Sequence, residues 1–377
     1  MEDSIKKWVW QHEKYPNFPY QKDNLTEYIS QIEYNRGQLD GMAKLFTQKD
    51  IKEIEIDTLV EEAMNTSEIE GEYFRRESVR SSVRKKLDET FTFEEDSSTR
   101  RSDALIAILI DCNMNCKPLD LVRLHGWHNA LFIGAYDVLN PINIASFRTV
   151  DEMEVVSGAI GHEKVHYLAP PQKQIEEDVL ALLKWCNESE ENIYIKSALA
   201  HLWFVAIHPY DDGNGRIARA ITDYLLSETA QNSFKLYSIS TAINSDRKGY
   251  YEVLDRTTNL FKNREYDFTL WLEWHLKTLN HAMEIALETI DAVVKKTKFW
   301  DRCRDKQLNT RQLKVLAKIF DKGAENFVGG INTKKYMAIA KTSRASAVRD
   351  LIQLLEYGCI RQIEATAGRN IRYELMI

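Results

Sequence analysis

Hydrophobic positions recur mainly with helical spacing along this chain of 377 residues. The stretch Arg216–Ser227 is one predicted helix, and its apolar residues share a face: Ile217, Ile221, Tyr224 and Leu225. Glycine and proline, the residues most typical of turns, number only 15 and 7. That leaves little material for the many turns of a β-rich fold. The pattern therefore predicts a mainly α-helical protein.

Further stretches with helical spacing are Asp57–Asn65, Asn280–Trp300, Thr310–Phe320 and Ser343–Leu355. The longest of them places four apolar residues on one side: Met283, Leu287, Ile290 and Val294. Ser343 suits the N-cap of the last helix, and Gly358 lies just past the end of that helix. Glu94–Ser102 is polar throughout, which predicts a linker or an exposed loop.

Two segments predict strands instead of helices. Gly158–Pro171 contains two glycines, then the β-prone run Val165–Leu168, then two prolines that would end a strand abruptly. Ile360–Leu375 alternates between apolar and polar residues around Gly368. We expect each segment to form a β-hairpin within the helical chain.

Composition narrows the class of protein. A hydrophobic content of 44% and a charged content of 28% are ordinary for a soluble globular protein. The N-terminal residues Met1–Lys7 lack the apolar core of a signal peptide, and no run of about 18 apolar residues occurs. We therefore expect a cytoplasmic protein without a membrane span. Reduced, buried thiols are favoured over a zinc site for the five cysteines, which are Cys112, Cys116, Cys186, Cys303 and Cys359.

Charge is distributed unevenly along the chain. The whole protein has a formal net charge of −7, which argues against a general affinity for nucleic acid. Residues 301–377, however, contain 15 lysines and arginines against 8 aspartates and glutamates. This asymmetry predicts a C-terminal domain whose partner differs from that of the rest of the chain.

The most informative stretch is residues 208–219, which read HPYDDGNGRIAR. Gly213, Asn214 and Gly215 form a turn that opens the predicted helix Arg216–Ser227. Glycines allow positive φ angles and a close approach of the backbone to a ligand. A helix that begins this way presents N–H groups and the positive end of its dipole, which together form an anion site.

The charged residues of this stretch suit a bound phosphate. Arg216 and Arg219 are three positions apart, so both can face an anion from one side of a helix. Asp212 offers a hard oxygen ligand for a Mg²⁺ ion that bridges phosphates. His208 precedes the turn and can accept a proton near neutral pH.

This stretch resembles the signature of the Fic family, His-Pro-Phe-x-Asp/Glu-Gly-Asn-Gly-Arg-x-x-Arg, with Tyr210 in place of the phenylalanine. The resemblance covers roughly residues 1–290. It implies a helical Fic-fold core with a small β-hairpin flap, and it implies a protein adenylyltransferase. Such an enzyme moves AMP from ATP to a serine, threonine or tyrosine hydroxyl of a target protein, which can be the enzyme itself.

The resemblance also implies roles for individual residues. His208 would take the proton of the attacking hydroxyl, and Asp212 would hold Mg²⁺ or Mn²⁺ on the α- and β-phosphates of ATP. Arg219 would orient the γ-phosphate. The complete nucleotide-binding set implied in this way is Asp212, Gly213, Asn214, Gly215, Arg216, Arg219, Tyr250 and Tyr251, with the two tyrosines near the adenine.

A second motif gains meaning beside this signature. Residues 66–71 read TSEIEG and resemble the family's inhibitory motif Ser/Thr-x-x-x-Glu-Gly/Asn, formed here by Thr66, Glu70 and Gly71. The resemblance implies that Glu70 pairs with Arg219. We expect the carboxylate to bind the guanidinium bidentately and so to occupy the seat of the γ-phosphate. The predicted hairpin before Pro170 resembles the family's flap, where Val165, His166 and Tyr167 would dock a target segment.

These observations predict four parts: an N-terminal helical domain with the inhibitory helix (1–96), a Fic core (97–285), a connecting helix (286–305) and a winged-helix-like domain (306–377). The last part is predicted from helices followed by a hairpin with a net positive charge, and DNA is its candidate partner. Two alternatives stay open. One is a transcriptional regulator with self-directed Fic activity, and the other is an enzyme that transfers another phosphate-bearing group or removes AMP. A homodimer is compatible with either.

Overall fold

The structure is a computed structural model of the chain. It describes residues 6–92, 94, 96–114, 117–133, 142–157, 164–230, 235–321, 330–363 and 371–376. The chain divides into two compact units, Met1–Leu287 and Glu288–Ile377, called here the N-terminal and C-terminal units. The division falls within the 35-residue helix α11 (Thr269–Cys303). The four predicted domain boundaries stay predictions.

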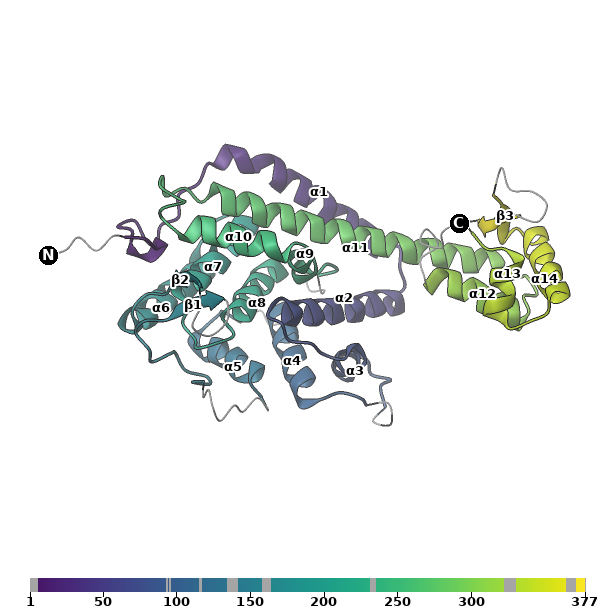
Figure 1. Cartoon of the computed structure of the whole chain (residues 1–377), viewed down its shortest axis with the longest axis horizontal. Coiled ribbons are helices and arrows are strands. Elements are labelled where there is room, and N and C mark those ends of the chain that lie inside the picture. The colour runs from purple at the N-terminus through teal and green to yellow at the C-terminus, as the bar shows by residue number, and fades with distance from the viewer. Residues whose placement is uncertain are drawn as a thin grey trace. The chain divides into compact units, whose positions relative to one another are not determined.

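The N-terminal unit is built from helices (Figure 1). In chain order they are α1 (Thr26–Ala43), α2 (Gln48–Ile69), α3 (Arg76–Leu87), α4 (Arg100–Met114), α5 (Leu121–Leu131), α6 (Gln172–Glu188), α7 (Ile193–Ile207), α8 (Asn214–Ser227), α9 (Ile239–Ser245) and α10 (Arg247–Thr258). Short 3-10 turns cover Val9–Gln11, Lys22–Leu25 and Glu228–Ala230. The prediction of a mainly α-helical fold is confirmed.

Helices α7 and α8 form the centre of the N-terminal unit. Nearly every residue of α7 is buried, and α8 is buried along almost its whole length. Trp271 of α11 donates its indole N–H to the carbonyl of Ala198 in α7 at 2.8 Å, so α11 is joined to this centre. The stretch 208–213 connects α7 to α8 and is therefore held at each end by a buried helix.

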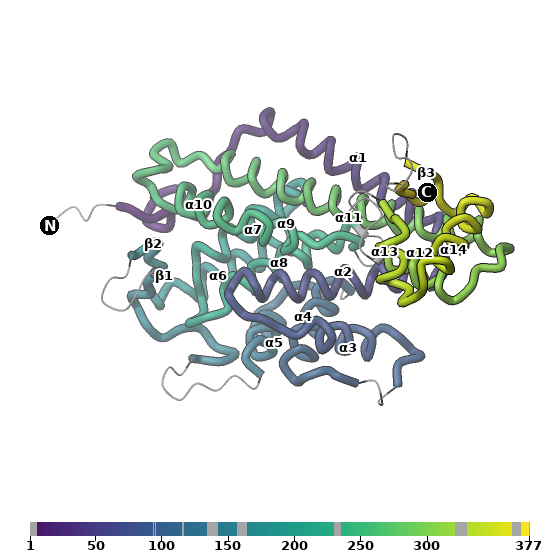
Figure 2. The backbone as a smooth tube through the Cα atoms, turned by 45° about the vertical axis from the view of Figure 1, so that its right-hand side comes forward, coloured from purple at the N-terminus to yellow at the C-terminus, as the bar shows by residue number. Residues whose placement is uncertain are grey.

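Helix α1 lies along α11 in both views of the backbone (Figures 1 and 2). The side chain of Asn35 in α1 donates to Asn280 Oδ1 in α11 at 2.8 Å, and both ends of this bond lie within the N-terminal unit. The sequence predicted a helix over Asn280–Trp300. The observed helix is longer at both ends, and at its N-terminal end Leu272, Leu276 and Leu279 continue the buried face.

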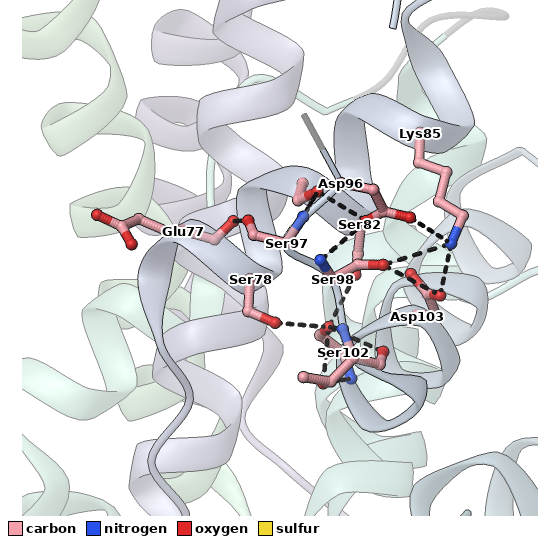
Figure 3. A network of polar contacts seen from close by, with 11 residues as sticks. Glu77, Ser78, Ser82, Lys85, Asp96, Ser97, Ser98, Ser102 and Asp103 are labelled. Atoms are coloured by element: carbon pink, nitrogen blue, oxygen red, sulfur yellow. Dashed lines mark hydrogen bonds and ion pairs between the residues drawn. The ribbon is translucent and has the colours of Figure 1, made fainter. Parts of the chain in front are cut away.

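Helices α2, α3 and α4 share one apolar cluster, whose buried members are Ile56, Leu59, Val60, Ala63, Val79, Val83, Leu105, Ile106 and Leu109. A polar network lies beside it (Figure 3), in which Lys85 contacts Asp96 at 3.1 Å and Asp103 at 3.0 Å. The predicted loop Glu94–Ser102 is therefore only partly right. Its last three residues form the first turn of α4. Glu95 lies outside the described residues.

The predicted hairpin before Pro170 is present. Strand β1 (Glu154–Ser157) pairs antiparallel with β2 (Lys164–Leu168), with Val155 opposite Tyr167. The connection 158–163, with both predicted turn glycines, lies outside the described residues. The aromatic N-terminal segment packs against β2: Trp10 donates to the carbonyl of Leu168 at 2.7 Å, and Trp8 contacts the Tyr167 ring edge-on at 5.3 Å.

The C-terminal unit contains α12 (Thr310–Asp321), α13 (Thr333–Ala340), α14 (Arg344–Glu356) and an antiparallel pair, β3 (Ile360–Gln362) and β4 (Tyr373–Leu375). Ser343 caps α14 through the N–H of Ser346, and Gly358 follows with φ 69°. Both features agree with the sequence. The short helix α13 was not predicted, and Gly368 lies outside the described residues. The two predicted helices and the hairpin follow one another in the predicted order, with α13 between the helices, and the winged-helix assignment stays a prediction.

The described cysteines are free and buried, as expected, and they are Cys112, Cys186, Cys303 and Cys359. Cys116 lies outside the described residues. Within the described part of the chain, no helix combines the length and the apolar character that a membrane span requires.

Candidate active site

His208 caps the C-terminal end of α7. Its backbone adopts the left-handed conformation, with φ 49° and ψ 59°, which turns the chain out of the helix. The ring Nδ1 lies 3.3 Å from the carbonyl oxygen of Val205. Because a carbonyl can only accept, Nδ1 carries the proton and Nε2 keeps its lone pair. Burial lowers the pKa of His208 to about 4, so the ring is neutral at pH 7 and ready to accept a proton.

The stretch after His208 is fixed by the side chain of Asn214. Its Oδ1 accepts from the N–H of Tyr210 at 3.0 Å, and its Nδ2 donates to the carbonyl of Tyr210 at 2.8 Å. The Tyr210 ring is fully buried and stacks on His128 with 3.9 Å between ring centroids. His128 in turn bonds the carbonyl of Asp212 at 3.2 Å. Asn214 and His128 thus hold the backbone of the turn in place. The predicted role of Asn214 in nucleotide binding stays a prediction.

Arg148 holds the carbonyl of His208 in place, a role that no pattern in the sequence indicates. The Arg148 side chain is fully buried, and its Nε donates to the His208 carbonyl at 2.9 Å. Its other nitrogens donate to the carbonyls of Val150 and Pro170, which flank the hairpin. One arginine therefore links the candidate base to the two ends of the predicted flap.

The N-terminal end of α8 has the features of an anion site. Gly213 is the N-cap, with φ 83°, and a β-carbon there would press against the ring of Phe132. The first N–H groups of a helix have no partner within that helix. At Gly215 the neighbour is the carboxylate of Glu70, which occupies the space that a β-carbon would need. A negatively charged group thus already lies at the start of α8.

Arg219 is bound on two sides by the end of α2. Its Nε donates to Thr66 Oγ1 at 2.8 Å and its Nη2 donates to the Thr66 carbonyl at 2.9 Å. Nη2 also donates to Glu70 Oε1 at 2.8 Å. The structure therefore contains the predicted pairing of Glu70 with Arg219, and it adds contacts between Thr66 and Arg219 that were not predicted. The expected bidentate geometry is wrong, because Glu70 uses one guanidinium nitrogen and Thr66 takes the remaining contacts.

Arg216 has a carboxylate partner that the sequence did not indicate. Its Nη1 donates to Glu72 Oε1 at 2.9 Å, and its Nη2 lies 3.6 Å from Asp212 Oδ2. Glu72 also pairs with Arg101 of α4 at 3.1 Å. No local pattern marks Glu72, since it lies in a polar run after the helix. Its role depends on the packing of α2 against α8. The two helices lie beside each other in both views of the backbone (Figures 1 and 2).

The carboxylate of Asp212 is 60% exposed, and its Oδ1 accepts from the N–H of Gly213. Mg²⁺ in nucleotide sites is held by one or two carboxylates together with phosphate oxygens and water. Among the described residues, no group of three or more His, Cys, Asp or Glu side chains could hold a metal ion. The exposed carboxylate of Asp212 fits an ion of this kind, which would arrive with the phosphates.

The remaining predicted site residues lie at different depths. Tyr250 is buried and its hydroxyl bonds His201 Nε2 at 3.0 Å, whereas Tyr251 is 44% exposed and donates to the carbonyl of Ile69 at 3.3 Å. In β2, Tyr167 is buried and donates to the carbonyl of Ala206, while Val165 and His166 are half-buried. The predicted contacts of these residues with adenine and target stay predictions.

Comparison with known protein families identifies the centre of the N-terminal unit. Residues 118–226 match the family described as Fic/DOC. The chain carries a Fic domain. Residues 8–88 match a second family, a domain of unknown function named DUF4172. The Fic match contains the whole stretch from His208 to Arg219, so the site just described lies within the Fic domain.

Solved structures show the same fold. A Fic family protein from Desulfovibrio desulfuricans G20 aligns with a TM-score of 0.57 at 18% identity, covering 96% of this chain and 98% of that one. A Fic domain containing signaling protein from Bacteroides thetaiotaomicron VPI-5482 aligns with a TM-score of 0.52 at 15% identity, covering 69% and 97%. At these identities the likeness concerns the fold.

One curated relative is named for its activity. The uridine 5'-monophosphate transferase of Xanthomonas campestris pv. campestris (strain 8004) is 32% identical over 65 residues. The match covers 15% of this chain and 12% of that protein.

Proposed function

We propose that this Fic domain transfers a nucleoside monophosphate, with AMP as the first candidate, from a nucleoside triphosphate to a hydroxyl group of a protein. The observation that carries the proposal is the placement of His208 directly before the anion site of α8. A neutral imidazole with a free Nε2 thus precedes a helix start that carries Arg216 and Arg219. A base beside a phosphate site is the arrangement that transfer to a hydroxyl requires.

In the proposed step, the target hydroxyl gives its proton to Nε2 of His208 while its oxygen forms a bond to the α-phosphorus. The bond between that phosphorus and the bridging oxygen breaks, and pyrophosphate leaves with the electron pair. The backbone N–H groups at the start of α8 would stabilise the negative charge that develops on the phosphoryl oxygens.

Unused hydrogen-bond donors support the phosphate site. Arg216 Nε and Arg219 Nη1 are buried nitrogens without a hydrogen-bond partner among the described residues. A buried donor without a partner is unfavourable, because it has lost water and gained nothing in exchange. Phosphate oxygens at the start of α8 would supply the missing acceptors. A bound Mg²⁺, held by Asp212, would neutralise charge on those phosphates.

Glu70 would keep this site closed. Its carboxylate lies at Gly215 and pairs with Arg219, so it takes the place and one of the contacts that a terminal phosphate would use. A nucleotide could then bind only with its phosphates displaced. The proposal is therefore a transferase that is inactive until the end of α2 moves or loses Glu70.

Transfer of UMP is a second candidate, because the curated relative in the comparison is named a uridine 5'-monophosphate transferase. One experiment addresses both. The full chain with Glu70→Gly is incubated with each of ATP, UTP, GTP and CTP labelled on the α-phosphate, alone and with cell lysate. We expect protein labelling from ATP. Labelling from UTP instead would favour the second candidate, and no labelling from any of the four would contradict both.

A further inference from the structure

The turn that ends α2 carries two carboxylates, Glu70 and Glu72, on either side of Gly71. Gly71 has φ 79°, its N–H donates to the Glu68 carbonyl at 2.9 Å, and the N–H of Glu72 donates to the Ser67 carbonyl at 3.0 Å. This pair of bonds is the Schellman motif that ends many helices. Both carboxylates therefore belong to one hydrogen-bonded turn and would move together.

Each carboxylate holds a different arginine of the Fic signature. Glu70 accepts from Arg219 at 2.8 Å, and Glu72 accepts from Arg216 at 2.9 Å. The two arginines are three positions apart on α8 and are 1% and 4% exposed. The two glutamates are 29% and 30% exposed. One turn of α2 thus places a carboxylate on each of two buried cations.

Two carboxylates, those of Glu72 and Asp212, lie close to the positive charge of Arg216. Asp212 lies 3.6 Å from its Nη2, and the Phe132 ring lies 5.3 Å from its guanidinium carbon. The second carboxylate oxygen of Glu72 pairs with Arg101, whose side chain is 47% exposed. Removing Glu70 alone would therefore leave a carboxylate on Arg216, next to the place where phosphates would bind.

We propose that Glu72 is a second inhibitory carboxylate, which lowers the affinity of the Fic site for nucleoside triphosphates by holding Arg216. The inference rests on the proposed function, because it assumes that a triphosphate occupies the start of α8. A triphosphate brings negative charge to within a few ångströms of Glu72, and the two repel. Full opening of the site thus requires both carboxylates to leave, and the shared turn makes that a single movement.

The test is the affinity of the full chain for a nonhydrolysable ATP analogue with Mg²⁺, measured by calorimetry. The variants are Glu70→Gly, Glu70→Gly with Glu72→Gln, and Glu70→Gly with Glu68→Gln. Glu68→Gln is the matched control, because it removes the same charge from the same turn and the structure shows no side-chain contact of Glu68 with either arginine. We expect Glu72→Gln to tighten binding on the order of tenfold and the control to change it by less than about twofold.

A second variant separates two effects of Glu72→Gln, which are the release of Arg216 and the loss of the Glu72–Arg101 ion pair. Arg101→Gln breaks that pair but leaves Glu72 on Arg216, so we expect no tightening in the Glu70→Gly background. Unchanged or weaker binding with Glu72→Gln would overturn the inference while leaving the proposed function in place. Equal tightening by Arg101→Gln would overturn it as well. No binding in any variant, Glu70→Gly included, would contradict the proposed function itself.

Discussion

The carboxylate of Glu70 fills the space that a β-carbon on Gly215 would need. A glycine at the second position of α8 therefore leaves room for the carboxylate, which a side chain at that position would displace. The same space would hold a phosphate in the proposed reaction. Gly215 therefore permits two competing occupants of one site.

Gly215→Ala should expel Glu70 without activating the enzyme, because the added methyl group excludes phosphate as well. We expect a loss of about 1–3 kcal/mol in the free energy of unfolding and no gain in labelling. Gly37→Ala in α1 is the matched control, because a β-carbon there meets nothing within 4 Å. That control should be neutral or stabilising by up to about 1 kcal/mol. Strong labelling by Gly215→Ala would mean that phosphate does not approach this glycine.

His208→Ala should abolish transfer and leave nucleotide binding intact. The side chain of His208 contacts the Val205 carbonyl and none of the arginines at the start of α8. Loss of a general base lowers a rate by about 10²–10⁴-fold. Labelling and nucleotide affinity are measured in the Glu70→Gly background, with and without His208→Ala. Full labelling without the imidazole would remove His208 from the mechanism.

The pH dependence of transfer should reflect the lowered pKa of His208. Burial lowers that pKa to about 4, so the ring stays neutral and active well below the usual value of about 6.5. In the Glu70→Gly chain, kcat/KM should stay level from pH 7 to about pH 5.5 and fall as pH drops through the pKa of His208. A decline centred near pH 6.5 would show that the ring titrates like an exposed histidine.

The C-terminal unit should give the full chain weak, salt-sensitive affinity for duplex DNA. The prediction depends on the excess of lysine and arginine over residues 301–377. Lys334→Gln with Arg344→Gln should weaken binding and reduce its salt dependence, measured by fluorescence anisotropy at two salt concentrations. Lys44→Gln with Lys49→Gln, in the N-terminal unit, removes equal charge and should change little.

Apolar residues offer a different use for α14, since three of them are exposed: Val348, Ile352 and Leu355. No binding of DNA even at low salt would favour a protein partner on this face.

The sequence predicted the site where its residues are contiguous and missed it where they are not. His208 to Arg219 form one uninterrupted stretch, and the pairing of Glu70 with Arg219 followed from the resemblance to the Fic family. Arg148 and Glu72 have no such local pattern. Arg148 acts by donating to backbone carbonyls of distant segments, and Glu72 acts only because α2 ends against α8.

Some helices were predicted wrongly or not at all for related reasons. The first turn of α4 is polar and its Ser102 side chain bonds to α3, so its composition resembles that of a loop. Ser82 Oγ donates to Ser102 Oγ at 2.8 Å in this contact. Helix α13 has only eight residues, which is too short for a periodic pattern to identify.

Self-labelling with ATP tests the central claim most directly, in wild type, Glu70→Gly, and Glu70→Gly with Arg219→Ala. We expect Glu70→Gly to label itself roughly 5- to 150-fold faster than wild type. This range corresponds to a coupling free energy of about 1–3 kcal/mol between Glu70 and the nucleotide. The double variant should lose the gain, because Arg219 is needed to orient the phosphates once Glu70 is gone. Equal labelling of wild type and Glu70→Gly would contradict the account, since Glu70 would then not hold the site closed.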